Sequence, residues 1–242
     1  PFSIIVLEKI KEHVVAVVTK PDAPVGRHLK LTPNPVKVWA LKYNVQVFEN
    51  IKDFLQEDFK DCIGLVGAYG KMIGPKTLSS LSDHIYGIHP SLLPKYRGPS
   101  PLQQQILDGI SETGVTVLKI DLGEDTGPIV AQEQDIILDS DTKESLGNRL
   151  FAKGAELFLK SDLSKTTPQD NSKATDTKMF TKQDGFVPWE EFQNQFKIEN
   201  LKLKISRMQR AFVGWPGVWT IDPEGKRIKL AASDLNFAKS MS

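Results

Sequence analysis

Apolar and polar positions alternate with two different periods along the first part of the chain. Continuous apolar runs predict buried strands at residues 14–19, 45–48, 62–67 and 84–89. Apolar residues spaced three or four apart predict helices at residues 2–11, 36–43, 51–57 and 75–81. Strands that alternate with helices are typical of a parallel sheet with both faces covered. We therefore predict an α/β fold, with a Rossmann-like open, mostly parallel sheet and helices on both faces.

The same pattern extends beyond residue 100. Ser100-Pro101 is a good helix start, a capping residue followed by a first-turn proline, for a helix at 102–108. Further apolar patterns predict two strands and a long helix, at residues 115–120, 129–138 and 142–159.

The composition changes near residue 160. Residues 161–182 are mostly polar and predict a linker between a first domain, 1–160, and a second domain, 183–242. The second domain combines an amphipathic helix with two short apolar runs, for which we predict a small, mostly β, OB-like fold. Its expected elements are a helix at 197–210 and strands at 218–221 and 227–231.

Charge and cysteine content narrow the possible partners. The formal net charge of the 242 residues is +1, which excludes a generally basic nucleic-acid-binding surface, so any RNA contact must come from a local cluster. The single cysteine, Cys62, cannot form an internal disulfide and is interpreted as a small buried hydrophobe, so a reducing compartment is expected. No apolar run reaches the roughly 18 residues that a membrane helix needs, so no membrane partner is expected.

Two titratable side chains stand at the ends of predicted strands and are followed by rigid loops. His89 closes the strand at 84–89, and Asp125 follows the strand at 115–120. Ligands of open parallel sheets bind beyond the carboxyl ends of the strands, so these two side chains can meet in one crevice. A lone histidine at a strand end is more often structural than catalytic, but the prolines and glycines that follow His89 fix its backbone as catalysis requires. We therefore predict an acid/base pair for proton transfer.

Several motifs carry a resemblance to a known family. They are His-Pro-Ser-Leu-Leu-Pro-Lys-Tyr-Arg-Gly at 89–98, Thr-Gly-Val-Thr at 113–116 and Asp-Thr-Gly at 125–127. In this order they resemble the formyltransferases that use 10-formyltetrahydrofolate. Segments 20–37 and 210–219 are similar to the tRNA-contacting loop and the carboxyl-terminal domain of the methionyl-tRNA formyltransferases within that family.

The resemblance implies a reaction and a set of site residues. The formyl group of the co-substrate 10-formyltetrahydrofolate would pass to the α-amino group of methionyl-initiator tRNA, without a metal. His89 would stabilise the oxyanion or shuttle the proton, and Asp125 would hold His89 in its useful protonation state and organise a water. The folate pocket would be lined by residues of two strand-end loops and closed by Asp121. The lining residues are Ser91, Leu92, Leu93, Pro94, Val66, Ala68, Tyr69 and Gly70.

A basic loop supplies the local cluster that RNA binding needs. Its cations include Lys20, Arg27, Lys30 and Lys37, with Asp22 as the one acid between residues 20 and 42. Such a cluster usually forms a solvated surface, but the resemblance implies that it contacts the phosphates of the tRNA. The implied role in translation initiation places the protein in the mitochondrial matrix, with the bacterial cytoplasm as the alternative.

Two departures from the family pattern leave alternatives open. The family places an asparagine two residues before the histidine, where its amide polarises the formyl oxygen, and this chain has Gly87. Losing one such donor typically costs on the order of a hundredfold to a thousandfold in rate. The family also opens with a strand ahead of the segment that matches Pro1. If that strand is genuinely absent, the sheet lacks a central strand; if processing removed it, nothing follows for the fold.

The alternatives follow from these departures. A nearby group replaces the asparagine, the enzyme is slow, or the protein has lost catalysis. In the last case it would act as an RNA-binding or structural component of a ribonucleoprotein such as the ribosome. A weaker alternative is a formyltransferase relative that acts on a nucleotide or sugar amine, against which the basic loop argues.

Overall fold

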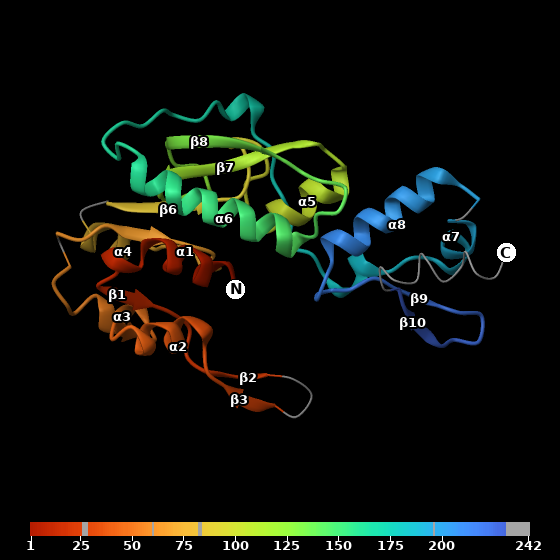
Figure 1. The fold of residues 1–242 in the computed structure, drawn as a ribbon, viewed down its shortest axis with the longest axis horizontal. Helices are drawn as coiled ribbons and strands as arrows, with labels where there is room; N and C mark the ends of the chain where they lie inside the picture. The colour runs from red at the N-terminus through yellow and green to blue at the C-terminus, as the bar shows by residue number, and fades with distance from the viewer. Residues whose placement is uncertain (26–28, 60, 82–83, 196, 231–242) are drawn as a thin grey trace.

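The computed structural model describes residues 1–25, 29–59, 61–81, 84–195 and 197–230 (Figure 1). Its first half contains α1 (Phe2–Ile10), β1 (Ala16–Val18), β2 (Ala23–Val25), β3 (Lys30–Thr32), α2 (Pro35–Lys42), β4 (Gln46–Phe48), α3 (Ile51–Phe54), β5 (Gly64–Val66), α4 (Pro75–Ser80) and β6 (Ile85–His89). Its second half contains α5 (Pro101–Asp108), β7 (Glu112–Lys119), β8 (Ile129–Ile136), α6 (Lys143–Lys160), α7 (Trp189–Asn194), α8 (Glu199–Ala211), β9 (Trp219–Ile221) and β10 (Arg227–Lys229).

The largest sheet is mixed, which corrects the prediction of a mostly parallel one. Its order is β5-β6-β7-β8, and only β5 and β6 are parallel. β6 and β7 are antiparallel, as are β7 and β8. β7 and β8 are joined directly by the loop at 120–128, which suits strands that run in opposite directions, whereas the link between β6 and β7 contains α5 and is long enough for either direction. A buried strand reads as a continuous apolar run in either case, so the sequence pattern of β7 could not distinguish the two.

A second sheet pairs β1 with β4 in parallel and stands apart from the first. Between β1 and β5 lies a cavity of about 390 Å³, lined largely by apolar side chains of α1, β1 and β5.

Helices cover both faces of the sheets, as predicted. On one face α1, α5 and α6 pack on the inner side chains of β6 and β7, with Ile88 and Val115 in the shared core. On the other, α3 and α4 pack against Ile85. Apolar side chains of α1 and α2 pack around Val17 of β1.

Part of the segment at 20–37, interpreted as a basic loop, forms a short hairpin in the structure. β2 and β3 pair antiparallel, and the hairpin extends from the body of the molecule beside α2 (Figure 1). All three residues of β3 are exposed, as are Ala23 and Pro24 of β2, so these short strands lack the alternation of buried and exposed positions that a sequence pattern could reveal. The chain re-enters the fold at Asn34, whose side chain accepts a hydrogen bond from the amide of Val36 and caps α2.

The carboxyl-terminal part shares the core of the first domain. The described residues of this part contain α7, α8 and one two-stranded sheet, β9-β10, whose strands lie where two strands were predicted, while the complete OB-like fold stays a prediction. The apolar side of α8, with Ile205 and Met208, joins the same cluster as Leu102 of α5 and Leu146 of α6. The apolar side of this amphipathic helix therefore packs against the first domain.

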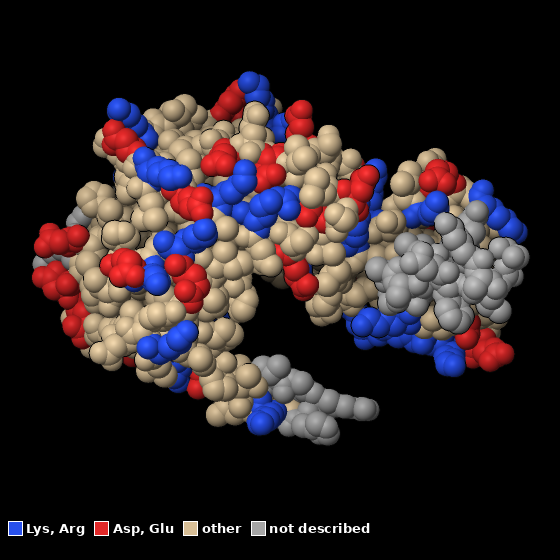
Figure 2. Space-filling view, in the orientation of Figure 1, with Lys and Arg blue, Asp and Glu red and all other residues tan. Residues whose placement is uncertain are grey.

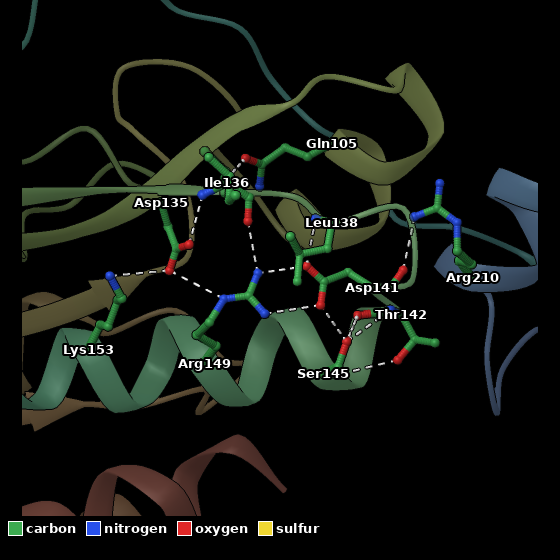
Figure 3. A network of polar contacts seen from close by, with 11 residues as sticks. Gln105, Asp135, Ile136, Leu138, Asp141, Thr142, Ser145, Arg149, Lys153 and Arg210 are labelled. Atoms are coloured by element: carbon green, nitrogen blue, oxygen red, sulfur yellow. Dashed lines mark hydrogen bonds and ion pairs between the residues drawn. The ribbon is translucent and has the colours of Figure 1, made fainter.

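A network of polar contacts lies between the first domain and the carboxyl-terminal part (Figure 3). The carboxylate of Asp141 accepts two bonds from Arg149, at 3.0 and 2.6 Å, and one from the hydroxyl of Ser145. The carbonyl of Asp141 accepts a bond from Arg210 of α8 at 2.9 Å. Burial raises the pKa of Asp141, but the bonds from Arg149, the Leu138 amide and Ser145 outweigh it, and the pKa is about 2. Asp141 is therefore held as a carboxylate that links α6 to α8.

None of the helices in the described ranges is long and apolar enough to cross a membrane.

Candidate active site

His89 and Asp125 are brought together at the carboxyl end of β6. Nδ1 of His89 lies 3.4 Å from Oδ2 of Asp125, and their side chains are 7% and 23% exposed. The backbone amide of Gly98 donates to the same Oδ2 at 2.8 Å. The carboxylate is thus fixed between the amide of one loop and the imidazole that precedes that loop.

The second ring nitrogen of His89 has a fixed role. Nε2 lies 2.8 Å from the backbone carbonyl of Tyr96. A carbonyl oxygen only accepts, so Nε2 must carry a proton in this bond. The nitrogen that can gain or lose a proton is therefore Nδ1, which faces the carboxylate of Asp125. A positively charged ring satisfies both acceptors at once.

The three loops around this pair each contain a non-glycine residue in the left-handed region. Ala68 follows β5 with φ 58°, Tyr96 follows β6 with φ 61°, and Asp125 follows β7 with φ 54°. Such conformations cost of order 1–3 kcal/mol each and gather where function demands a particular backbone. Their grouping here supports the view that these loops form a site.

The loop after His89 is held from inside. Ser91 is fully buried, and its hydroxyl donates to the carbonyl of Lys95 at 2.7 Å. The buried hydroxyl of Thr116 on β7 donates to the carbonyl of Ser91 and accepts from the amide of Leu93. Gln132 of β8 donates to both the Leu93 carbonyl and the Thr116 hydroxyl. Ser91 and Leu93 therefore shape the loop from within, while Leu92 and Pro94 are partly exposed.

The other predicted folate-lining residues lie beside this loop, at the end of β5. Val66 is paired in register with Gly87, so the loop at 67–70 follows directly beside His89. Val66, Ala68 and Tyr69 line the cavity of about 390 Å³, and a Cβ at Gly70 would lie 3.9 Å from Nζ of Lys20. The loops after β5 and β6 thus both lie at the end of the sheet where His89 is found.

Asp121 lies on the loop that leads to Asp125. Its carboxylate accepts bonds from the amide of Gly123 and the hydroxyl of Thr126, which fold the turn. It lines a hollow of about 470 Å³ together with Pro75, Leu78, Ser79, Lys119, Ile120, Leu122 and Pro128.

The space beside Gly87 is apolar. A Cβ at this position would lie 2.7 Å from Cδ1 of Ile120 and 3.2 Å from Cδ2 of Leu118. The nearest atoms on that side of Gly87 are therefore hydrocarbon, and none of them can take the place of the family's asparagine amide.

Tyr96 carries the only phenol of the loop at 89–98. Burial, helped by the Asp108 carboxylate, raises the pKa of Tyr96 to about 12. Its hydroxyl thus keeps its proton and is unsuited to act as a base.

The predicted cations of the basic loop differ in their surroundings. Lys20 and Lys30 are exposed, whereas Nζ of Lys37 is paired with Asp22 at 3.0 Å and Glu49 at 2.6 Å. Arg27 lies outside the described residues. Figure 2 shows Lys and Arg mixed with Asp and Glu over the face that α6 occupies, in agreement with the low net charge.

Within the described ranges no group of three or more His, Cys, Asp or Glu side chains could hold a metal ion.

Comparison with known proteins identifies the family to which the chain belongs. A family model described as formyl transferase matches residues 5–161. The chain belongs to the formyl transferase family. The methionyl-tRNA formyltransferase of Roseiflexus castenholzii is 36% identical over 235 residues, covering 90% of this chain and 72% of that protein. The methionyl-tRNA formyltransferase of Caldicellulosiruptor saccharolyticus is 35% identical over 244 residues, covering 95% and 75%.

Solved structures show the same fold at lower identity. An N-formyltransferase from Helicobacter canadensis in complex with folinic acid and dTDP-3-aminofucose has a TM-score of 0.63 and 21% identity, covering 92% of this chain and 81% of that one. The sugar 3N-formyl transferase WlaRD has a TM-score of 0.61 and 20% identity, covering 92% of this chain and 79% of the other.

Sequence reasoning missed the backbone groups that hold the pair in this formyl transferase. The carbonyl of Tyr96 and the amide of Gly98 bond to His89 and Asp125, yet neither bond depends on a side chain that a pattern could reveal. It also missed Gln169 and Thr175, which lie in the polar segment interpreted as a linker. Nothing in that segment's composition distinguishes these two from their neighbours.

Proposed function

We propose that this formyl transferase moves the formyl group of 10-formyltetrahydrofolate to the α-amino group of methionyl-initiator tRNA. The single observation that carries the proposal is the pairing of His89 with Asp125 at the end of β6, within a chain that matches methionyl-tRNA formyltransferases over nine-tenths of its length.

The reaction needs one proton to leave the attacking amine and one to reach the departing nitrogen. The amine forms a C–N bond to the formyl carbon, and the C–N bond to the folate breaks. Because Nε2 of His89 is committed to the Tyr96 carbonyl, Nδ1 and the Asp125 carboxylate are the groups that take and return the proton. A charged His89 ring also favours the negative oxygen of the tetrahedral state.

The folate is proposed to occupy the end of the sheet between the loops after β5 and β6. Ala68 and Tyr69 would contact it from one loop, and Leu92 and Pro94 from the other, while Ser91 and Leu93 act through the shape of the loop. Asp121 would border the site through the turn that it folds.

The tRNA is proposed to lie against the β2-β3 hairpin and the carboxyl-terminal part, which flank an open hollow in Figure 2. Lys20 and Lys30 would contact phosphates, with Arg27 as a further candidate. Lys226, Arg227 and Lys229 lie on or beside β10 and are further candidates for phosphate contacts from the carboxyl-terminal part. A complete OB-like fold would extend the two strands seen here.

The alternative of a retired, RNA-binding protein gains nothing from the comparisons, since the matching relatives carry enzyme names. The apolar surroundings of Gly87 bear on the rate of the enzyme, and the ribosome has no supporting observation. The proposed role places the protein in the mitochondrial matrix or a bacterial cytoplasm, which fractionation of the source cells would decide.

The test is transfer of labelled formyl from 10-formyltetrahydrofolate to methionyl-tRNA. The parent chain is expected to formylate methionyl-tRNA, and His89→Ala is expected to lose about a hundredfold or more in kcat. Lys165→Ala serves as the matched control, because its exposed ammonium pairs with Asp162 of the same turn. Undetectable transfer by a parent chain that binds the folate and the tRNA would refute the proposal.

A further inference from the structure

Gln169 lies between the two loops that carry the proposed acid/base pair. Its Oε1 accepts bonds from Nε and Nη2 of Arg97, at 3.1 and 2.7 Å. Its Nε2 donates to the backbone carbonyls of Asp125 and Gly127, at 2.8 and 2.7 Å. One amide therefore ties the loop after β6 to the Asp125 turn.

The orientation of this amide is unambiguous. A guanidinium only donates and a carbonyl only accepts, so the oxygen of Gln169 must face Arg97 and its nitrogen must face the turn. All four bonds are made in this orientation and none in the reverse one. The Arg97 side chain is buried, and its other acceptor here is the Asn171 side chain at 2.8 Å.

The segment around Gln169 holds the same loops through its backbone. The Thr175 hydroxyl accepts from the amide of Tyr96, and the Thr175 carbonyl accepts from the amide of Arg97. Thr177 bonds in turn to the Arg97 carbonyl and the Ser100 amide. Residues 167–177 thus form a clasp over both sides of the site, although their composition predicted a linker.

The Asp125 turn needs such support. Asp125 has φ 54°, a conformation that surrounding contacts must maintain. Its carboxylate has to stay in front of Nδ1 of His89, and a displacement of about 1 Å in such a site can cost about a hundredfold in rate. The bonds from Gln169 to the carbonyls on either side of Thr126 fix this backbone.

We propose that Gln169 is a positioning residue, which holds the Asp125 carboxylate in line with His89 by clamping the turn to Arg97. The inference rests on the proposed function for its kinetic readout. It adds a requirement beyond the acid/base pair itself. For full activity, the clasp at 167–177 must be bound to the two loops that carry His89 and Asp125.

The decisive variant is Gln169→Glu. A glutamate keeps an acceptor oxygen for Arg97 and adds a charge that favours that pair, but its second oxygen replaces the N–H donor that faces the two carbonyls of the turn. Gln169→Ala removes both sets of bonds. Asn171→Ala is the matched control, because it removes another acceptor of Arg97 from the same clasp and leaves the Asp125 turn untouched.

Formyl transfer and thermal unfolding are measured for the parent and the three variants. We expect Gln169→Glu and Gln169→Ala to lose about tenfold to a hundredfold in kcat, with KM for both substrates within about twofold. Asn171→Ala should keep kcat within about twofold. Parent-like kcat in Gln169→Glu would overturn the proposal. So would a loss of kcat in all three variants that follows their loss of Tm.

A second readout is independent of turnover. The ring-nitrogen NMR shifts of His89 report which nitrogen carries the proton, and His89 is one of four histidines, so the His89→Ala spectrum assigns it. We expect these shifts to differ between the parent and Gln169→Glu at one pH. Unchanged shifts would overturn the positioning role, whereas changed shifts in a parent without formyl transfer would refute only the proposed reaction.

Discussion

Ile120 occupies the space that a side chain on Gly87 would need, because Cδ1 of Ile120 lies 2.7 Å from the position of a Cβ there. Gly87 and His89 point to the same face of β6, since side chains alternate along a strand. The family's asparagine would therefore point toward the site, and Ile120 stands where it would go.

We predict that Gly87→Asn with Ile120→Val raises kcat for formyl transfer, by up to about a hundredfold, because the amide supplies a donor for the formyl oxygen. Valine lacks Cδ1, so the double variant removes the 2.7 Å contact, and the Leu118 side chain, whose Cδ2 lies 3.2 Å from the Cβ, has to move only slightly. Gly87→Asn alone should gain less, because Ile120 must first move. Steady-state kinetics of the double variant against Ile120→Val is the measurement, and an equally stable double variant with no gain in kcat would contradict the prediction.

Thr116 is predicted to act through the shape of the loop after His89. Thr116→Val leaves the Leu93 amide and the Ser91 carbonyl without their partner, at about 1–3 kcal/mol of unfolding free energy. KM for the folate should rise more than kcat falls, because the loop edge and not the acid/base pair is disturbed. Denaturant unfolding and kinetics test this, with Gln104→Ala on the exposed side of α5 as the control. A parent-like KM would count against the role.

The Asp141–Arg149 pair is predicted to dominate the stability of the junction between α6 and α8. Arg149→Ala leaves the carboxylate of Asp141, only 4% exposed, without its cation and should cost about 3–5 kcal/mol. Lys153→Ala breaks the more exposed pair with Glu133 and a second pair with Asp135, which keeps Arg149 as a partner, and should cost about 1 kcal/mol or less. If the two variants lost the same unfolding free energy in urea, the Asp141–Arg149 pair would not be the main stabilising contact between α6 and α8.

Acid should destabilise the fold through the same carboxylate. The pKa of Asp141 is about 2 in the folded chain, below its ordinary value of 3.8. Its contribution, about 2 kcal/mol, is therefore present above about pH 4 and is lost as the pH falls toward 2. Asp141→Asn should show a shallower loss of unfolding free energy between pH 4 and pH 2 than the parent, and parallel curves would be the contrary result.

Lysines of the basic loop should differ in their effect on tRNA binding. Lys20→Ala and Lys30→Ala should each lower the slope of log affinity against log salt by about 0.7–0.9, the value for one phosphate contact. Lys37→Ala should change the slope less, because its ammonium is held by Asp22 and Glu49. Filter binding at several salt concentrations decides, and a Lys37 effect as large as that of Lys30 would show that its ion pairs open on binding.

The sequence by itself determined the elements, the family motifs and the two titratable residues of the site. Local rules suffice for these. Asn34-Pro35 and Ser100-Pro101 begin helices where predicted, and each apolar run from residues 14–19 to 129–138 contains a strand. His89 and Asp125 were singled out because rigid loops follow them, and the structure places them 3.4 Å apart.

Only the tertiary structure decided the strand directions, the role of the clasp and the surroundings of Gly87. An apolar run has the same appearance in parallel and antiparallel pairs, so the mixed sheet was not predictable from periodicity. Gln169, Thr175 and the backbone of Tyr96 act through bonds to residues far along the chain, and such bonds leave no periodic signal in a polar segment. Gly87 is a similar case, because its neighbour Ile120 is far along the chain. The sequence shows that the family's asparagine amide is missing, and only the fold shows that Ile120 fills the space of that side chain.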